Sequence, residues 1–226
     1  MFEIKYFSDN NRLNQINKDS IYIHDHGDRI ICSIADGVNS KKLSKLGAME
    51  VQNKLVDYTK SVLDTELLDV VALKTKFTMI IKETLHDLSK RANEVLTEFA
   101  STLIFLVILK NQNKGICVHI GDGILISQDE NHDVNILSYP QNGISEEYTY
   151  TTVYKNLYDV LNINVIPLNK MYNIYMMSDG AENPFYKKCR FTQKGKNILK
   201  SGLEYVKKSL ENIATDDYSV IQIRKI

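Results

Sequence analysis

Three Asp-Gly pairs constrain the fold of this chain more than any other feature of its sequence. Each follows closely on an apolar segment that is typical of a buried strand. The pairs are Asp36-Gly37, Asp122-Gly123 and Asp179-Gly180, after Ile30–Ala35, Ile116–Ile120 and Ile174–Met177. Two further acidic positions flank strands, since Asp19 precedes Ser20–His24 and Asp216-Asp217 precede Tyr218–Arg224. Acids at the ends of five strands indicate a cluster of carboxylates at the sheet ends.

Simpler explanations exist for each aspartate alone. Asp-Gly is the commonest hairpin-turn signal, and Gly121-Asp122-Gly123 between two strands fits such a turn. Asp36 and Asp179 lead into loops before helices, where helix N-capping is the alternative. A carboxylate cluster would suit Mg²⁺ or Mn²⁺, which prefer oxygen ligands. Patterns for zinc, P-loop, dinucleotide and serine-hydrolase sites are absent from the sequence.

Hydrophobic periodicity predicts an α+β chain. We expect two amphipathic helices, Leu43–Val62 and Leu73–Val95, and a third over Thr192–Asn212. Residues Tyr139–Asn169 read as irregular, and Asp25–Asp28 as a hairpin turn. Strands are predicted at Glu3–Phe7, Ser20–His24, Arg29–Ala35, Thr102–Lys110, Gly115–Ile120, Ile124–Ser127, Val134–Ser138, Ile174–Met177 and Tyr218–Arg224. Blocks of strands and helices without a repeat or linker indicate one layered domain, residues 1–226.

The composition indicates which kinds of binding partner and which cell compartment to expect. The 28 Lys and Arg balance the 28 Asp and Glu, so we expect no nucleic-acid partner. The apolar runs are too short for a bilayer, and we expect no membrane association. Three widely spaced cysteines and an N-terminus without an apolar signal region favour a cytoplasmic location. Cys32 and Cys117 fall within apolar strands and are expected in the core.

Six short segments follow one another along the chain in a recognisable order. They are Asn17-Lys18-Asp19-Ser20, Ala35-Asp36-Gly37-Val38-Asn39-Ser40 with Ser44 and Gly47-Ala48, Ser101-Thr102-Leu103, Ile120-Gly121-Asp122-Gly123, Met177-Ser178-Asp179-Gly180 and Thr215-Asp216-Asp217-Tyr218-Ser219. Together these segments resemble the PPM or PP2C-type metal-dependent protein phosphatases, closer to a divergent bacterial branch than to the large eukaryotic enzymes. The resemblance implies a four-layer α-β-β-α sandwich with two central antiparallel sheets, and a protein-serine/threonine phosphatase.

The resemblance also implies roles for the acids. Asp36 would bridge two Mn²⁺ or Mg²⁺ ions, and Gly37 would offer its carbonyl. Asp179 and Asp216 would complete the first ion's ligands, and Asp122 would help to hold a third, looser ion. Asp19 would act through water or on the neighbouring ligands. A metal-bridged hydroxide would then attack phosphorus and hydrolyse the phosphomonoester.

The sequence departs from the family pattern at positions that contact the phosphate of the substrate. Asn14 stands where an Arg is frequent, with Arg12 two residues earlier, and Lys18 replaces an acid or Gln. Lys18 and Arg12 are therefore candidate phosphate contacts. Val38 replaces a His general acid of the eukaryotic enzymes. We expect a monomer that acts on a phosphorylated protein and has a cognate kinase. The alternative is a catalytically weak relative that serves as a phosphoprotein-binding or regulatory module.

Overall fold

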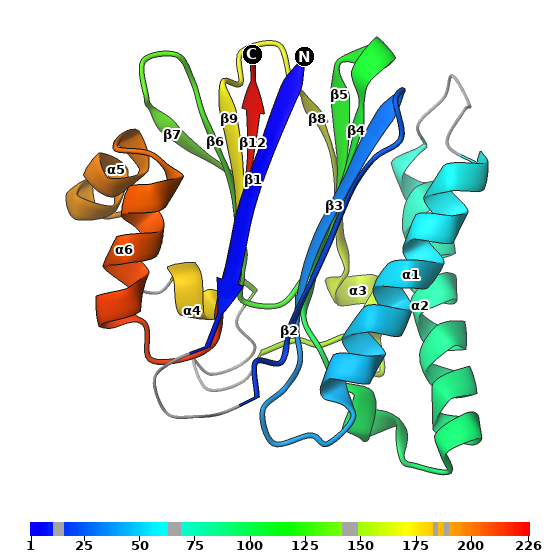
Figure 1. The fold of residues 1–226 in the computed structure, drawn as a ribbon. Helices are drawn as coiled ribbons and strands as arrows, with labels where there is room; N and C mark the ends of the chain where they lie inside the picture. The colour runs from blue at the N-terminus through cyan, green and yellow to red at the C-terminus, as the bar shows by residue number, and fades with distance from the viewer. Residues whose placement is uncertain (11–15, 63–68, 142–148, 183–184, 188–189) are drawn as a thin grey trace.

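Two five-stranded sheets face each other in the computed structural model, which describes residues 1–10, 16–62, 69–141, 149–182, 185–187 and 190–226 (Figure 1). All neighbouring strands pair antiparallel. The first sheet has the order β1 (Phe2–Asp9), β12 (Tyr218–Lys225), β9 (Asn173–Met177), β6 (Ile124–Gln128) and β7 (Val134–Ser138). The second has the order β2 (Asp19–Asp25), β3 (Arg29–Asp36), β4 (Leu103–Leu109), β5 (Lys114–Ile120) and β8 (Asn162–Pro167).

Helices cover the outer face of each sheet (Figure 1). The long helices α1 (Ser44–Val62) and α2 (Val70–Ala92) pack on the second sheet, and α5 (Gln193–Lys200) and α6 (Leu203–Ile213) lie beside the first. The predicted four-layer α+β sandwich is thereby confirmed. None of the helices in the described ranges is long and apolar enough to cross a bilayer. The short elements are η1 (Leu96–Phe99), η2 (Lys110–Gln112), α3 (Leu157–Val160), α4 (Asp179–Glu182), β10 (Tyr186–Lys187) and β11 (Arg190–Phe191).

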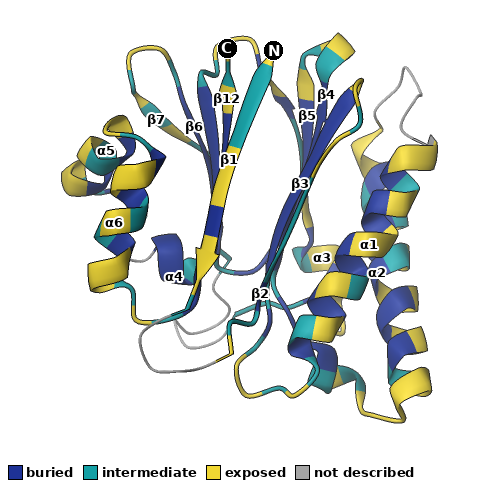
Figure 2. Cartoon of the chain, viewed as in Figure 1, coloured by how far each residue is buried: buried dark blue, intermediate teal, exposed yellow. Residues whose placement is uncertain are grey.

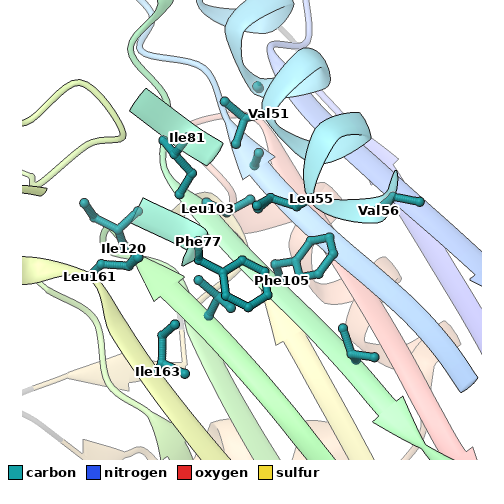
Figure 3. Close-up of a cluster of buried hydrophobic side chains, with 14 of the residues drawn as sticks. Val51, Leu55, Val56, Phe77, Ile81, Leu103, Phe105, Ile120, Leu161 and Ile163 are labelled. Carbon is teal, nitrogen blue, oxygen red and sulfur yellow. The ribbon is translucent and has the colours of Figure 1, made fainter. Parts of the chain in front are cut away.

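The core is divided among the three interfaces between these layers. Strand β4 shows why, since all seven of its residues are buried and successive side chains point to opposite faces. Phe105 points toward the helices, where its ring lies 6.2 Å from that of Phe77 on α2 (Figure 3). Ile104 and Leu106 point into the apolar layer between the sheets, which also contains Cys32 and Cys117. Exposed residues of α1 and α2 lie mainly on their outer faces (Figure 2).

Three expectations about regular structure were wrong. The second helix ends at Ala92 because Asn93 adopts the left-handed conformation, φ 52°, and caps it. The third predicted helix is two helices, since Gly202 with φ 93° interrupts it. The stretch expected to be irregular, Tyr139–Asn169, contains α3 and β8. Strand β8 pairs with β5. This pairing makes the segment a strand, although its own residue pattern does not predict one.

The predicted hairpin at Asp25–Asp28 and the alternative hairpin at Asp122 have opposite outcomes. Asp25–Asp28 does connect the antiparallel pair β2 and β3. Asp122 is in no hairpin, because β5 belongs to the second sheet and β6 to the first. Gly121 adopts φ 116° there and packs against Thr102. The chain therefore crosses between the sheets at Asp122, at the end of the sandwich opposite to both termini (Figure 1).

Candidate active site

Five aspartates meet where the two sheets come together at this end. Asp19 and Asp36 are cross-strand partners on β2 and β3. Asp122 lies on the crossing, Asp179 begins α4 after β9, and Asp216 precedes β12. Burial raises the pKa of Asp36 well above its usual value, and the charges of the other four aspartates raise it further. The sequence-predicted acids therefore do form one cluster.

Asp19 is held by hydroxyl groups of the opposite sheet. Its Oδ2 accepts hydrogen bonds from Ser178 Oγ at 3.0 Å and from Ser219 Oγ at 2.5 Å. Burial is the main reason why the pKa of Asp19 rises to about 6, and the hydrogen bonds from Ser219 and Ser178 oppose this rise. Oδ1 of Asp19 is buried and no described hydroxyl or amide donates to it. A buried carboxylate oxygen without a donor is suited to a cation.

Asp179 follows strand β9 of the first sheet. Burial, followed by the charge of Asp122, raises the pKa of Asp179 to about 7, although the backbone N–H of Gly180 donates to its Oδ1 at 2.6 Å. Burial also raises the pKa of Asp122, and the hydroxyl of Thr149 donates to this carboxylate and lowers it. Both aspartates are thus partly desolvated acids in a field of like charges.

Glu182 is an acid of this cluster that the sequence analysis missed. It is buried on α4, and no described group donates to its Oε2. Burial and then the charges of Asp179 and Asp122 raise the pKa of Glu182 to about 9. The signal that would have found it is its spacing, because residues three apart on a helix lie on one face.

Two glycines let the acidic loops approach other backbone segments closely. A Cβ on Gly37 would lie 2.8 Å from Ser44 Oγ and 3.0 Å from the backbone nitrogen of Lys45, which are shorter than ordinary contacts. A Cβ on Gly180 would overlap the carbonyl oxygen of Asp217. The Gly after each aspartate is therefore required by packing.

Lys18 braces the loop that follows Asp36. Its ammonium donates to the carbonyls of Asn39 and Lys41, each at 2.7 Å, and its backbone N–H donates to Asp217 at 2.8 Å. Asn39 in turn donates to Asp216 Oδ1 at 3.1 Å. Two of the three ammonium donors are thus occupied, and the predicted phosphate contact of Lys18 stays a prediction. Arg12 and Asn14 lie outside the described residues.

An open cavity of about 460 Å³, here called the acidic cavity, reaches Asp36 and Asp122. Lys41 adds a cation to its wall and lies 3.4 Å from Glu98. Sequence reasoning gave no signal for Lys41, because it belongs to an irregular loop. The other wall residues are small or hydroxylated: Val38, Thr97, Ala100, Thr102, Thr149, Thr151 and Val153.

The donor set fits a hard divalent cation. Carboxylate and carbonyl oxygens are the ligands that Mg²⁺ and Mn²⁺ prefer, and the buried Oδ1 of Asp19 and Oε2 of Glu182 have no hydrogen-bond donor among the described residues. Within those residues no three His, Cys, Asp or Glu side chains are yet close enough to hold an ion.

The comparisons with known proteins agree with this architecture. The profile of the family described as Protein phosphatase 2C matches residues 9–213. The chain therefore belongs to the protein phosphatase 2C family, as its sequence segments predict. A search of curated protein sequences finds no match.

Solved structures of this fold resemble the chain over its full length. The serine/threonine phosphatase Stp1 from Staphylococcus aureus has a TM-score of 0.71 at 15% identity, covering 100% of this chain and 96% of Stp1. RsbX, solved in complex with magnesium, has a TM-score of 0.63 at 16% identity, covering 99% and 94%. PppA, a regulatory component of the type VI secretion system in Pseudomonas aeruginosa, has a TM-score of 0.68 at 14% identity, covering 100% and 98%. At these identities the likeness establishes the fold.

Proposed function

We propose that this protein is a metal-dependent phosphoprotein phosphatase that hydrolyses phosphoserine and phosphothreonine. The observation that carries the proposal is the convergence of five aspartates from both sheets beside one polar cavity. Membership of the protein phosphatase 2C family supports it, and so does the magnesium in the RsbX structure.

Particular residues of this chain would hold the ions. Asp36, Asp179, Asp216 and the carbonyl of Gly37 would bind two Mn²⁺ or Mg²⁺ ions, and Asp122 a third. The charges of Asp179 and Asp122 raise the pKa of Glu182, and this carboxylate would share the third position. Bound ions of this kind acidify water and neutralise charge on phosphoryl oxygens.

The protein's own groups would position the phosphoester. Lys41 and the threonine hydroxyls of the acidic cavity would bind phosphoryl oxygens through charge and hydrogen bonds. Asp19, fixed by Ser178 and Ser219, is the cross-strand partner of Asp36 and would hold that strand end in place for Asp36 to bind the ions. Val38 has no titratable group, so this loop position supplies no proton to the leaving alkoxide.

The test is hydrolysis of p-nitrophenyl phosphate and of a phosphothreonine peptide with Mn²⁺ or Mg²⁺. We expect EDTA and Asp36→Asn to abolish turnover, and Asp87→Asn, on an exposed position of α2, to preserve it. Turnover that survives both EDTA and Asp36→Asn would refute the metal mechanism. The Asp87 variant controls for a general effect of removing a charge.

A second candidate is a phosphoprotein-binding module with little catalysis. It is favoured by Lys18, whose ammonium braces a loop at a position where the family commonly has an acid or Gln. Calorimetric titration with Mn²⁺ separates the two functions. Metal binding without turnover of any phosphoester, but with phosphopeptide binding, would establish the module. A phosphorylated protein partner with its own kinase is proposed in both cases.

A further inference from the structure

A second cavity, of about 330 Å³, lies between α2 and the segment 152–155. We call it the apolar cavity, because its wall is formed largely by the carbon atoms of Leu85, Leu96, Val153 and Tyr154. Lys82, Glu83, His86 and Lys155 are exposed residues that also line it. The apolar part of this surface is well suited to an aliphatic side chain.

The apolar cavity adjoins the acidic cavity along two chain segments. Val153 lines both cavities. On η1, Leu96 lines the apolar cavity and the next residue, Thr97, lines the acidic one. Likewise, Thr152 lines the apolar cavity and Thr151 lines the acidic cavity. One thin wall therefore separates the two cavities, and a single bound segment can occupy both.

Hydrogen bonds fix this wall in place. The backbone N–H of Thr152 donates to the carbonyl of Ser101 at 2.8 Å, and Ser101 N–H donates to the hydroxyl of Thr152 at 3.3 Å. Lys82 Nζ donates to the carbonyl of Lys155 at 3.3 Å and links α2 to the segment. The cavity is thus formed before any partner binds, which lowers the entropic cost of binding.

We propose that the apolar cavity binds an aliphatic side chain of the substrate protein, close in sequence to the phosphorylated residue. This inference rests on the proposed phosphatase function. In an extended peptide, side chains two residues apart lie on one face at roughly 7 Å, a spacing that suits neighbouring cavities. The occupant is the substrate chain, because the apolar cavity adjoins, across the shared Val153, the cavity that would receive its phosphoryl group.

A set of phosphothreonine peptides tests the proposal. One leucine is moved through the three positions on each side of the phosphothreonine in an otherwise alanine sequence. We expect one position to raise kcat/KM by about tenfold, the gain typical of filling an apolar pocket. His86→Trp, which fills the cavity from its exposed rim, is expected to remove that gain and to leave p-nitrophenyl phosphate turnover unchanged.

Asp87→Trp is the matched control, because Asp87 is the next exposed residue of α2 and lines the groove toward α1. It should retain the leucine preference. Equal kcat/KM for all peptides, or a leucine gain that persists in His86→Trp, overturns the apolar-cavity proposal while the phosphatase function stands. Failure to hydrolyse p-nitrophenyl phosphate and every peptide overturns the phosphatase function, and the apolar-cavity proposal with it.

Discussion

Removing the charge of Asp179 is expected to stabilise the metal-free protein at alkaline pH. Burial and the charge of Asp122 raise the pKa of Asp179 from 3.8 to about 7. A carboxyl with a higher pKa in the folded state binds its proton more tightly there than in the unfolded state. Its contribution to stability is therefore complete below about pH 4 and is lost as the pH rises through about 7.

The size of the effect follows from this pKa interval. At roughly 1.4 kcal/mol per pKa unit, Asp179 titrating alone would remove about 4 kcal/mol from the free energy of unfolding between pH 4 and pH 8. The neighbouring acids share the same repulsion and titrate together with it, so we expect Asp179→Asn to recover about 2 kcal/mol at pH 8. At pH 4 the variant and the wild type should be equally stable. The asparagine keeps an oxygen that can accept the N–H of Gly180.

The free energies of unfolding of the wild type and of Asp179→Asn are measured by urea unfolding in EDTA at pH 4, 6 and 8. Unfolding is followed by far-ultraviolet circular dichroism, because the chain has no Trp. Added Mn²⁺ should reverse the order at pH 8, since the wild type gains binding free energy that the variant lacks. Asp87→Asn should follow the wild type throughout. A metal-free wild type that grows more stable from pH 6 to pH 8, or an Asp179→Asn variant that is less stable than wild type at pH 8, would refute the reasoning.

Three further predictions concern the supports of the cluster. Gly37→Ala places a Cβ 2.8 Å from Ser44 Oγ. We expect this variant to lose about 1–3 kcal/mol of unfolding free energy in urea and roughly a hundredfold in kcat. The control Gly27→Ala, whose Cβ meets nothing within 4 Å, should retain kcat. Ser178→Ala removes the hydroxyl that donates to Asp19 and accepts from the backbone N–H of Ser219. We expect it to lower the free energy of unfolding by about 1–3 kcal/mol, and to weaken Mn²⁺ binding in calorimetry. Lys18→Ala should raise KM for p-nitrophenyl phosphate; an unchanged KM would limit Lys18 to bracing the loop.

Most of the fold could be predicted because its elements are marked locally. Helix α1 and strand β4 have unbroken periodic or apolar patterns, and Asp25–Asp28 is a turn between two strands that do pair. Strand β8 has a mixed pattern, with exposed and half-buried residues among buried ones, and only its pairing with β5 makes it a strand. Which sheet a strand joins is also decided at long range. For this reason Asp122 reads as a hairpin residue in the sequence and lies on a crossing in the structure.

The candidate site divides in the same way. Asp36 and Asp179 are recognisable from an apolar strand followed by Asp-Gly. Lys41 and Thr149 carry no such mark, because they reach the acidic cavity from irregular segments whose paths depend on tertiary contacts. Glu182 was detectable in principle from its spacing to Asp179, but the helix that gives this spacing its meaning is only four residues long.

The acid cluster also closes this end of the sandwich. Two sets of polar links join the sheets at or beside the cluster: Asp19 with Ser178 and Ser219, and the Lys18 backbone N–H with Asp217. The layer between the sheets behind them is apolar. Since a single set of carboxylates both joins the sheets and would hold the ions, cation binding and the approach of the sheet ends are expected to be coupled. Ions that neutralise the cluster would draw the acids of the two sheets together.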